Sequence, residues 1–317
     1  MKKLFFLFIT LLSFQFVNAQ DSSDEMMDST ELAQLPIAPA DLAEIKKLED
    51  TLAYLSYKIV NDSLDNNRFA SVHKFIPTLV KTLKHKNSFH YPFQRLKTVS
   101  IQYPQDSTFR IFTWQVYVEQ GIYHYYGAIQ MKGEDLKLFP LRDRSEQIED
   151  IEHQTLTADN WYGSLYYNIK QFETRYGTHY ALFGFDRVDF FNKSKMIDVL
   201  HFRDGQPQFG APVFISKNPQ KPFTKSRIIL QYSAASSIRC NYDEFMEMIV
   251  FDHLIEVSQG VPGQGGKYVT DGSYEGFKYD NGVWVHLPKM FTTVSDEAPR
   301  ETPVLDQRKK KDIFGNR

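Results

Sequence analysis

From Lys97 onward, the chain is a succession of short runs rich in aromatic and β-branched residues, with turn residues between most of them. Such runs are typical of β-strands. Strands joined by links this short must run antiparallel to each other. The expected strands are 97–103, 109–118, 122–131, 136–141, 163–172, 179–185, 195–202, 208–215, 227–232, 246–252 and a closing hairpin at 274–287.

Two of these strands carry apolar residues on both faces. In 109–118, Phe112, Trp114 and Val116 alternate with Phe109 and Ile111. The run 179–185 is almost continuously apolar, which suits a strand that is covered on both sides. We therefore expect a two-layer β-structure or a curved sheet, with a propeller-like arrangement as the alternative.

The closing hairpin has the clearest turn signal in the chain. Asn281-Gly282 stands between two aromatic and β-branched runs, and this pair favours a type I′ turn, in which both central residues have positive φ. An isolated hairpin is barely stable in water, so we expect this one to join the main sheet and to bury Trp284.

Before the strands, two segments have a helical period. Apolar residues recur at spacings of three and four in 42–59 and in 69–83, with turn residues at 61–67 between them. An antiparallel helix pair is the expected structure, and Pro77 predicts either a kink or a later start of the second helix. The fold class is thus α+β: a helix pair followed by a large, mainly antiparallel β-rich domain.

The chain divides into five expected parts. Lys2 and Lys3, an apolar run over 4–12 and the small residues before Gln20 are typical of a secretory signal peptide that is cleaved after Ala19. No later segment approaches the length of a transmembrane helix. The expected parts are a signal peptide (1–19), an acidic flexible leader (20–40), a helical hairpin (41–86), the β-rich domain (87–294) and a Pro-containing basic tail (295–317).

Composition limits the classes of function. A formal net charge of −2 does not suit a general nucleic-acid binder. Cys240 is the only cysteine, so no intramolecular disulfide can form. The 26 Phe, 18 Tyr and 3 Trp provide the material for a large core, which must supply the stability.

Common catalytic and cofactor motifs are missing from the sequence. It has no Gly-x-Ser-x-Gly elbow, no His-Glu-x-x-His helix and no phosphate-binding loop that ends in Lys-Ser or Lys-Thr. The glycine-rich stretch 260–266 precedes a strand rather than a helix, which favours a mobile loop over a phosphate site. We expect no catalytic residue and no cofactor.

The segment 241–254 gathers four carboxylates and a histidine, so it is the best local candidate for a metal or acid–base site. Strand alternation places Glu247 and His253 on one face and Asp252 on the other, and three or four converging ligands do not result. Turn carboxylates and a histidine at a strand end are the preferred interpretation, and no metal site is expected. Cys240 has no histidine beside it and is interpreted as a small buried residue.

Aromatic residues are the remaining candidates for ligand binding. Trp161 and Tyr162 lie in a polar loop that enters a strand, where an indole could stack on a sugar while Asp159 and Asn160 bond its hydroxyls. A Trp at such a place often closes the end of a β-core, and this is the preferred role for Trp161. His124, His179 and His201 lie among aromatics in strands and are interpreted as packing residues.

Several segments together resemble an uncharacterised family of exported Bacteroidota proteins that has no assigned activity: 87–115, 127–131, 136–141, 197–202 and 274–287. The resemblance implies an exported protein, in the cell envelope or secreted, and a shared fold. It implies no site residue.

Two classes of function remain open. The first is a non-catalytic, exported cell-envelope module, periplasmic or extracellular, that binds a protein or glycan partner. The alternative is a hydrolase that acts on an envelope polymer or glycan through carboxylates from different strands. A cleft with two facing acids supports the hydrolase, whereas an aromatic groove supports the binding module.

Overall fold

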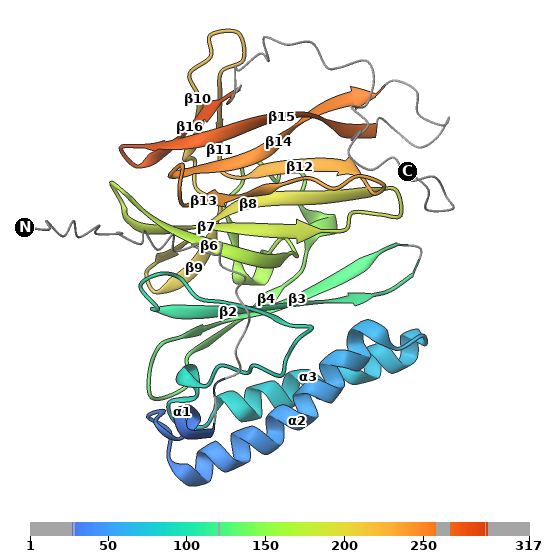
Figure 1. Ribbon diagram of the computed structural model, residues 1–317, viewed down its shortest axis with the longest axis vertical. Coiled ribbons are helices and arrows are strands. Elements are labelled where there is room, and N and C mark those ends of the chain that lie inside the picture. The colour runs from blue at the N-terminus through green and yellow to red at the C-terminus, as the bar shows by residue number, and fades with distance from the viewer. Residues whose placement is uncertain (1–26, 28, 120, 258–266, 289, 291–317) are drawn as a thin grey trace, which may run out of the picture.

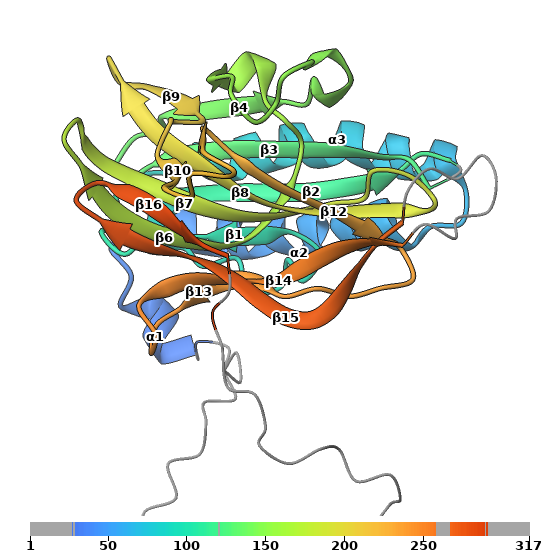
Figure 2. The ribbon, with the colours of Figure 1, turned by 90° about the horizontal axis from the view of Figure 1, so that it is seen from above.

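The computed structural model describes residues 27, 29–119, 121–257, 267–288 and 290. Helices α2 (Pro39–Asn61) and α3 (Asp65–Leu83) form an outer layer, and three β-sheets are stacked above it (Figure 1). Figure 2 views the same stack from above. Three separate hydrophobic clusters fill the three spaces between these four layers.

The helix pair has the expected apolar stripes. Leu52 and Phe75 are completely buried, and Val72 is nearly so, in the cluster between the helices and the first sheet. The helix α3 begins at Asp65 and continues through Pro77, so the expectation of a later start was wrong. Pro77 lies on the exposed side of the helix.

The end of the expected acidic leader is anchored rather than free. Residues Ser29–Ala33 form the short helix α1, and α2 already begins at Pro39. Ile37 is buried, while Leu32 and Leu35 pack against the same cluster as the two long helices. These three apolar residues explain why this part of the leader adopts a fixed structure.

The first sheet lies directly on the helices and has the order β1-β2-β3-β4, with every neighbouring pair antiparallel. Its central strand β2 is covered on both faces, as expected from the pattern of 109–118. Phe112 and Trp114 pack toward the helices, while Phe109 and Ile111 pack toward the middle sheet. The strands are β1 (Ser100–Gln102), β2 (Phe109–Tyr117), β3 (Tyr123–Met131) and β4 (Leu138–Arg142).

The middle sheet has the order β5-β9-β8-β7-β6, and β12 pairs with the other half of β8. It too is covered on both faces: Ala181 and Phe183 pack toward the third sheet, while Tyr180 and Leu182 pack toward the first. The strands are β5 (Leu156–Thr157), β6 (Leu165–Thr174), β7 (Gly177–Asp186), β8 (Asn192–Arg203), β9 (Gln206–Phe209) and β12 (Ile228–Ser233).

The third sheet has the order β11-β10-β16-β15-β14-β13 and forms the other outer layer. The pair β10–β16 is parallel and joins segments far apart in the chain, which local spacing does not predict. The strands are β10 (Phe214–Ser216), β11 (Phe223–Lys225), β13 (Cys240–Asp243), β14 (Met248–Val257), β15 (Lys267–Asp280) and β16 (Val283–Leu287).

The expected strand 208–215 is two strands in different sheets. Strand β9 ends at Phe209 and β10 starts at Phe214, so the chain crosses from the middle sheet to the third sheet between them. Gly210 allows the crossing, because it has a φ of +92° and a Cβ there would lie 2.6 Å from the carbonyl oxygen of Gln154. The α+β class therefore holds, but with three open sheets in place of two layers, and the described residues form no closed propeller.

The closing hairpin is present as expected. Asn281 and Gly282 have φ values of +48° and +89°, and Asp280 pairs with Val283 across the turn. Trp284 is 2% exposed and packs in the cluster between the middle and third sheets. The hairpin thus belongs to the core.

No helix in the described ranges is both long enough and apolar enough to cross a membrane. The expected signal peptide (1–19), the glycine-rich stretch (260–266) and the basic tail (295–317) lie outside the described residues.

Candidate functional site

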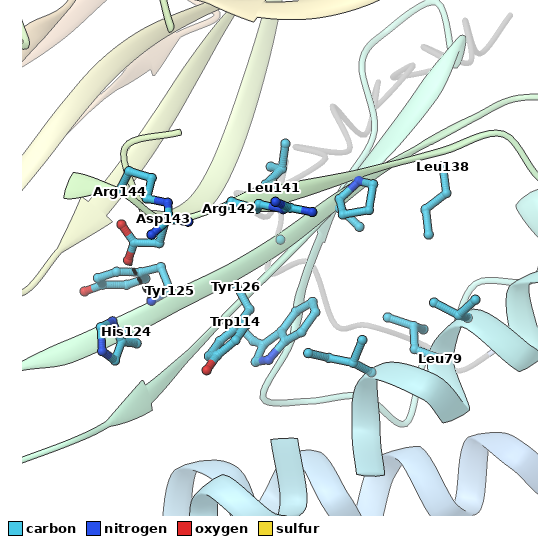
Figure 3. A pocket seen from close by; sticks show the side chains of 15 residues that line it. Leu79, Trp114, His124, Tyr125, Tyr126, Leu138, Leu141, Arg142, Asp143 and Arg144 are labelled. Carbon is cyan, nitrogen blue, oxygen red and sulfur yellow. Dashed lines mark hydrogen bonds between the residues drawn. The ribbon is translucent and has the colours of Figure 1, made fainter. Parts of the chain in front are cut away.

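A groove opens where the helix pair stops covering the first sheet. Both helices lie mainly over β2, so the same face of β3 and β4 is left partly uncovered beside α3. We call this hollow of about 400 Å³ the α3–β4 groove. Figure 3 shows Leu79 and Leu138 at one end of it and His124, Asp143 and Arg144 at the other.

The floor of the groove is aromatic and its walls are aliphatic. The Trp114 indole stacks on Tyr126 with ring centroids 5.7 Å apart, and its other neighbour is Phe75, edge-on at 5.1 Å. Ile76 on α3 and Leu138 on β4 line the two sides. The indole Nε1 of Trp114 is buried without a hydrogen-bond partner in the described structure.

A second, polar pocket of about 320 Å³ adjoins the polar end of the groove. We call it the Asp186 pocket. It shares four lining residues with the groove, so the two hollows adjoin: these residues are His124, Tyr125, Asp143 and Arg144.

Asp143 follows β4 and is held by donors from three segments. Its Oδ2 accepts the backbone N–H of Tyr125 over 3.0 Å, and its Oδ1 accepts the N–H and hydroxyl of Ser145 over 3.0 and 2.5 Å. Oδ1 also accepts the N–H of Gly163 over 3.2 Å. A Cβ at position 163 would collide with this carboxylate, so glycine is required there. Asp143 therefore joins β3, β4 and the loop before β6.

Asp186 lies at the end of β7 and is 6% exposed. Burial raises its pKa to about 6, the hydroxyls of Tyr162 and Tyr125 act in the opposite direction, and the negative charge of Asp143 adds to the increase. Two carboxylates from different strands thus share the pocket. The protonation of Asp186 changes near neutral pH.

Two arginines complete the pocket. Arg144 is exposed and Arg187 half-buried, and neither forms an ion pair or a side-chain hydrogen bond with any residue that the structure describes. The Nε of Arg187 is buried without a partner, and its guanidinium lies 5.8 Å from the Tyr123 ring centroid. These two cations are available to a ligand.

Exposed apolar residues flank the Asp186 pocket. Ile122 and Val188 line it and are 42% and 38% exposed, and the β7–β8 turn that carries Val188 adds Phe190 and Phe191 at 60% and 42%. The two turns that carry them are in contact, since a Cβ on Gly121 would lie 2.6 Å from the Cα of Phe190. We call Ile122, Val188, Phe190 and Phe191 the apolar rim.

The two aromatic residues that the sequence singled out have different positions. Trp161 is 0% exposed and donates its Nε1–H to the Tyr166 hydroxyl over 2.9 Å, so it closes the core between the first and middle sheets. It offers no ring face to a ligand. Tyr162 lines the Asp186 pocket and donates its hydroxyl hydrogen to Asp186. Asp159 pairs with Arg142 over 3.3 Å at the surface.

The residues of 241–254 do not converge on one site. Asp243 accepts the N–H groups of the turn that follows it, and Asp252 accepts the backbone N–H of Arg239. His253 contacts Glu275 on the neighbouring strand, and Glu275 also contacts His286 over 2.6 Å. The described residues contain no group of three or more side chains that could hold a metal.

Burial raises the pKa of the Cys240 thiol to about 12, so this cysteine is a poor nucleophile.

His179 and His201 stack in parallel, 4.9 Å apart, at a cavity of about 770 Å³ beside β8 and β9. Burial, together with the neighbouring His179, lowers the pKa of His201. His179 is bonded to the carbonyl of Gly177, whereas Nδ1 of His201 is buried without a partner. His124, the third strand histidine, lies exposed where the α3–β4 groove meets the Asp186 pocket.

Fold and site together define a layered α+β protein with an apolar groove that adjoins a polar pocket lined by two arginines and three carboxylates. Comparisons with protein-family models, curated proteins and solved structures find no match for the chain. Its function must therefore be argued from the groove and the pocket themselves.

Proposed function

We propose that the protein is a non-catalytic, exported cell-envelope module that binds a protein partner along the α3–β4 groove and the Asp186 pocket. The position of these two hollows side by side, with four lining residues in common, carries the proposal. An extended protein segment has both the apolar side chains that suit the groove and the polar groups that suit the pocket.

The lining favours a protein over a glycan as the partner. The groove presents aliphatic side chains, including Ile76, Leu79 and Leu138, where a sugar would need partners for its hydroxyls. The apolar rim adds exposed Phe190 and Phe191 beside the polar pocket. Apolar and aromatic side chains around a polar patch are typical of protein interfaces.

Site-specific photo-crosslinking tests the proposal in intact cells. A benzophenone amino acid at Ile76, which is 36% exposed and lines the groove, should capture a discrete protein partner. Leu64 is 59% exposed but does not line the groove, so the same amino acid there serves as the control. Adding Arg144→Glu to the Ile76 variant should weaken the capture.

Equal capture from positions 76 and 64, or none from 76, would contradict the proposal. Captured material that contains sugar and no peptide would favour the glycan partner instead.

A hydrolase that acts on an envelope polymer is the second candidate. The raised pKa of Asp186, about 6, suits a general acid, and Asp143 lies in the same pocket. The binding module is preferred because Asp143 already accepts four hydrogen bonds and Asp186 is 6% exposed. Release of soluble fragments from isolated cell-wall polymer by the wild type, but not by Asp186→Asn, would establish the hydrolase.

A further inference from the structure

The Asp186 pocket is lined by charged residues of both signs, two arginines and three carboxylates. Arg144 and Arg187 both line the pocket, and neither forms an ion pair there. Arg142, on the neighbouring strand end, differs in that it pairs with Asp159 over 3.3 Å. The pocket thus holds two cations that a ligand can use.

The carboxylates of the pocket form no ion pair with these arginines. Both oxygens of Asp143 accept hydrogen bonds from Tyr125, Ser145 and Gly163. Oδ2 of Asp186 accepts the Tyr162 hydroxyl over 2.8 Å. Glu146 also lines the pocket, but it is exposed and makes no ion pair within the described ranges. The two arginines thus lack a bonded carboxylate among the described residues, although they share the pocket with three carboxylates.

Two buried donors, one at the groove and one at the pocket, also lack acceptors among the described residues. One is Nε1 of Trp114 in the groove, and the other is Nε of Arg187 at the pocket. A buried donor without a partner destabilises the protein, and a ligand oxygen that accepts its hydrogen bond removes that penalty. Backbone carbonyls and carboxylates both supply such oxygens.

From this arrangement we infer that Arg144 and Arg187 bind a carboxylate of the protein partner. Guanidinium groups match the planar carboxylate and bond it through parallel N–H donors. The partner segment then has apolar residues that lie in the α3–β4 groove, followed by an acidic side chain or a C-terminal carboxylate. This inference rests on the proposed function, because it assumes that a protein segment occupies the groove.

Short acetylated peptides provide matched probes. Three end in an amide, namely Leu-Ala-Leu-Glu, Leu-Ala-Leu-Gln and Leu-Ala-Leu-Lys, and a fourth is Leu-Ala-Leu-Gln with a free C-terminal carboxylate. Binding is measured by tryptophan fluorescence, since Trp114 lines the groove while Trp161 and Trp284 are buried in other clusters. Comparison of the Glu peptide with the free-carboxylate peptide shows whether the carboxylate comes from an acidic side chain or from a C-terminus.

We expect the Glu peptide, or the free-carboxylate peptide, to bind about tenfold more tightly than the neutral Gln peptide, and the Lys peptide to bind least tightly. Arg144→Glu and Arg187→Glu should reverse this order. Glu146→Gln should strengthen the preference for the carboxylate. Arg175→Glu is the matched control, because Arg175 is exposed at the β6–β7 turn, at the opposite end of β7, and should keep the wild-type order.

The failure of this inference is distinguishable from that of the proposed function. Equal affinities for the four peptides would overturn the carboxylate site and leave the groove intact. If no peptide binds, or if Ile76→Glu leaves the binding of all four unchanged, the groove itself is not the binding site.

Discussion

The Tyr162 hydroxyl donates a 2.8 Å hydrogen bond to Oδ2 of Asp186 and so links the loop before β6 to the end of β7. This bond favours the ionised form of the carboxyl, whereas its burial favours the neutral form. Burial has the larger effect, because the pKa of Asp186 is raised to about 6.

The first prediction concerns the pH dependence of stability. An unfolded Asp has an ordinary pKa of 3.8, so the folded state binds the Asp186 proton more tightly than the unfolded state does. The contribution of this group to stability is therefore complete below pH 4 and is lost as pH rises to about 6, a change on the order of 3 kcal/mol. Asp186→Asn should remove this decline.

Urea denaturation at pH 4, 5, 6 and 7 measures the effect, with Asp159→Asn at an exposed position as the control. A wild-type midpoint that rises between pH 4 and 6, relative to Asp186→Asn, would refute the assigned sign.

The second prediction concerns the closing hairpin. Trp284 is 2% exposed and contacts the rings of Phe172 and Tyr279 at centroid distances of 5.5 and 5.4 Å. Trp284→Ala should lower the free energy of unfolding by roughly 3–5 kcal/mol, as large aromatic truncations in cores do. Denaturant titration measures this loss, and Tyr268→Ala at a 40% exposed position of the same sheet should have a small effect. A midpoint unchanged in Trp284→Ala would mean that the indole is not a core residue in solution.

The third prediction concerns the seam between the helix pair and the first sheet. Leu52 is 0% and Val72 3% exposed, so Leu52→Asp or Val72→Asp would bury a carboxylate among apolar side chains. We expect a loss of several kcal/mol in unfolding free energy for each variant. Tyr54→Asp changes a 63% exposed residue of the same helix and should leave thermal unfolding nearly unchanged. Equal melting temperatures for Leu52→Asp, Val72→Asp and Tyr54→Asp would contradict the burial of this seam.

The fourth prediction concerns export. The two lysines, the short apolar run and the small residues before Gln20 lead us to expect cleavage after Ala19. The mature protein should begin at Gln20, which N-terminal sequencing or intact mass determines. An exported fraction that retains Met1 would show that the segment is not a cleaved signal peptide.

Local patterns in the sequence predict most of the secondary structure. The helical stripes, the Asn281-Gly282 turn and the burial of both faces of β2 and β7 all depend on neighbours within a few residues. The assignment of strands to sheets depends on contacts between distant segments. For this reason the sequence did not separate β2 and β7 into different sheets, and it did not reveal the parallel pair β10–β16.

The candidate site was harder to predict, since its residues come from separate strand ends. Asp143 and Arg144 follow β4, whereas Asp186 ends β7 and Arg187 follows it, and no motif connects the two pairs. A weak signal was available: each pair places an acid beside an arginine where an apolar strand ends. Trp114 was identified only as a strand residue, because alternation shows which face it lies on and not that the helices leave this face partly open.

The middle sheet determines how the protein unfolds, because its two faces belong to two different hydrophobic clusters. Strand β8 contributes Ile197 and Val199 to one cluster and Met196 and Leu200 to the adjacent one, so neither cluster can be lost without breaking a wall of the other. We therefore expect the layers to unfold cooperatively, in a single calorimetric transition. The amide hydrogens of β7 and β8 should exchange with deuterated solvent only through this global opening, more slowly than those of β15 and β16 in the outer sheet.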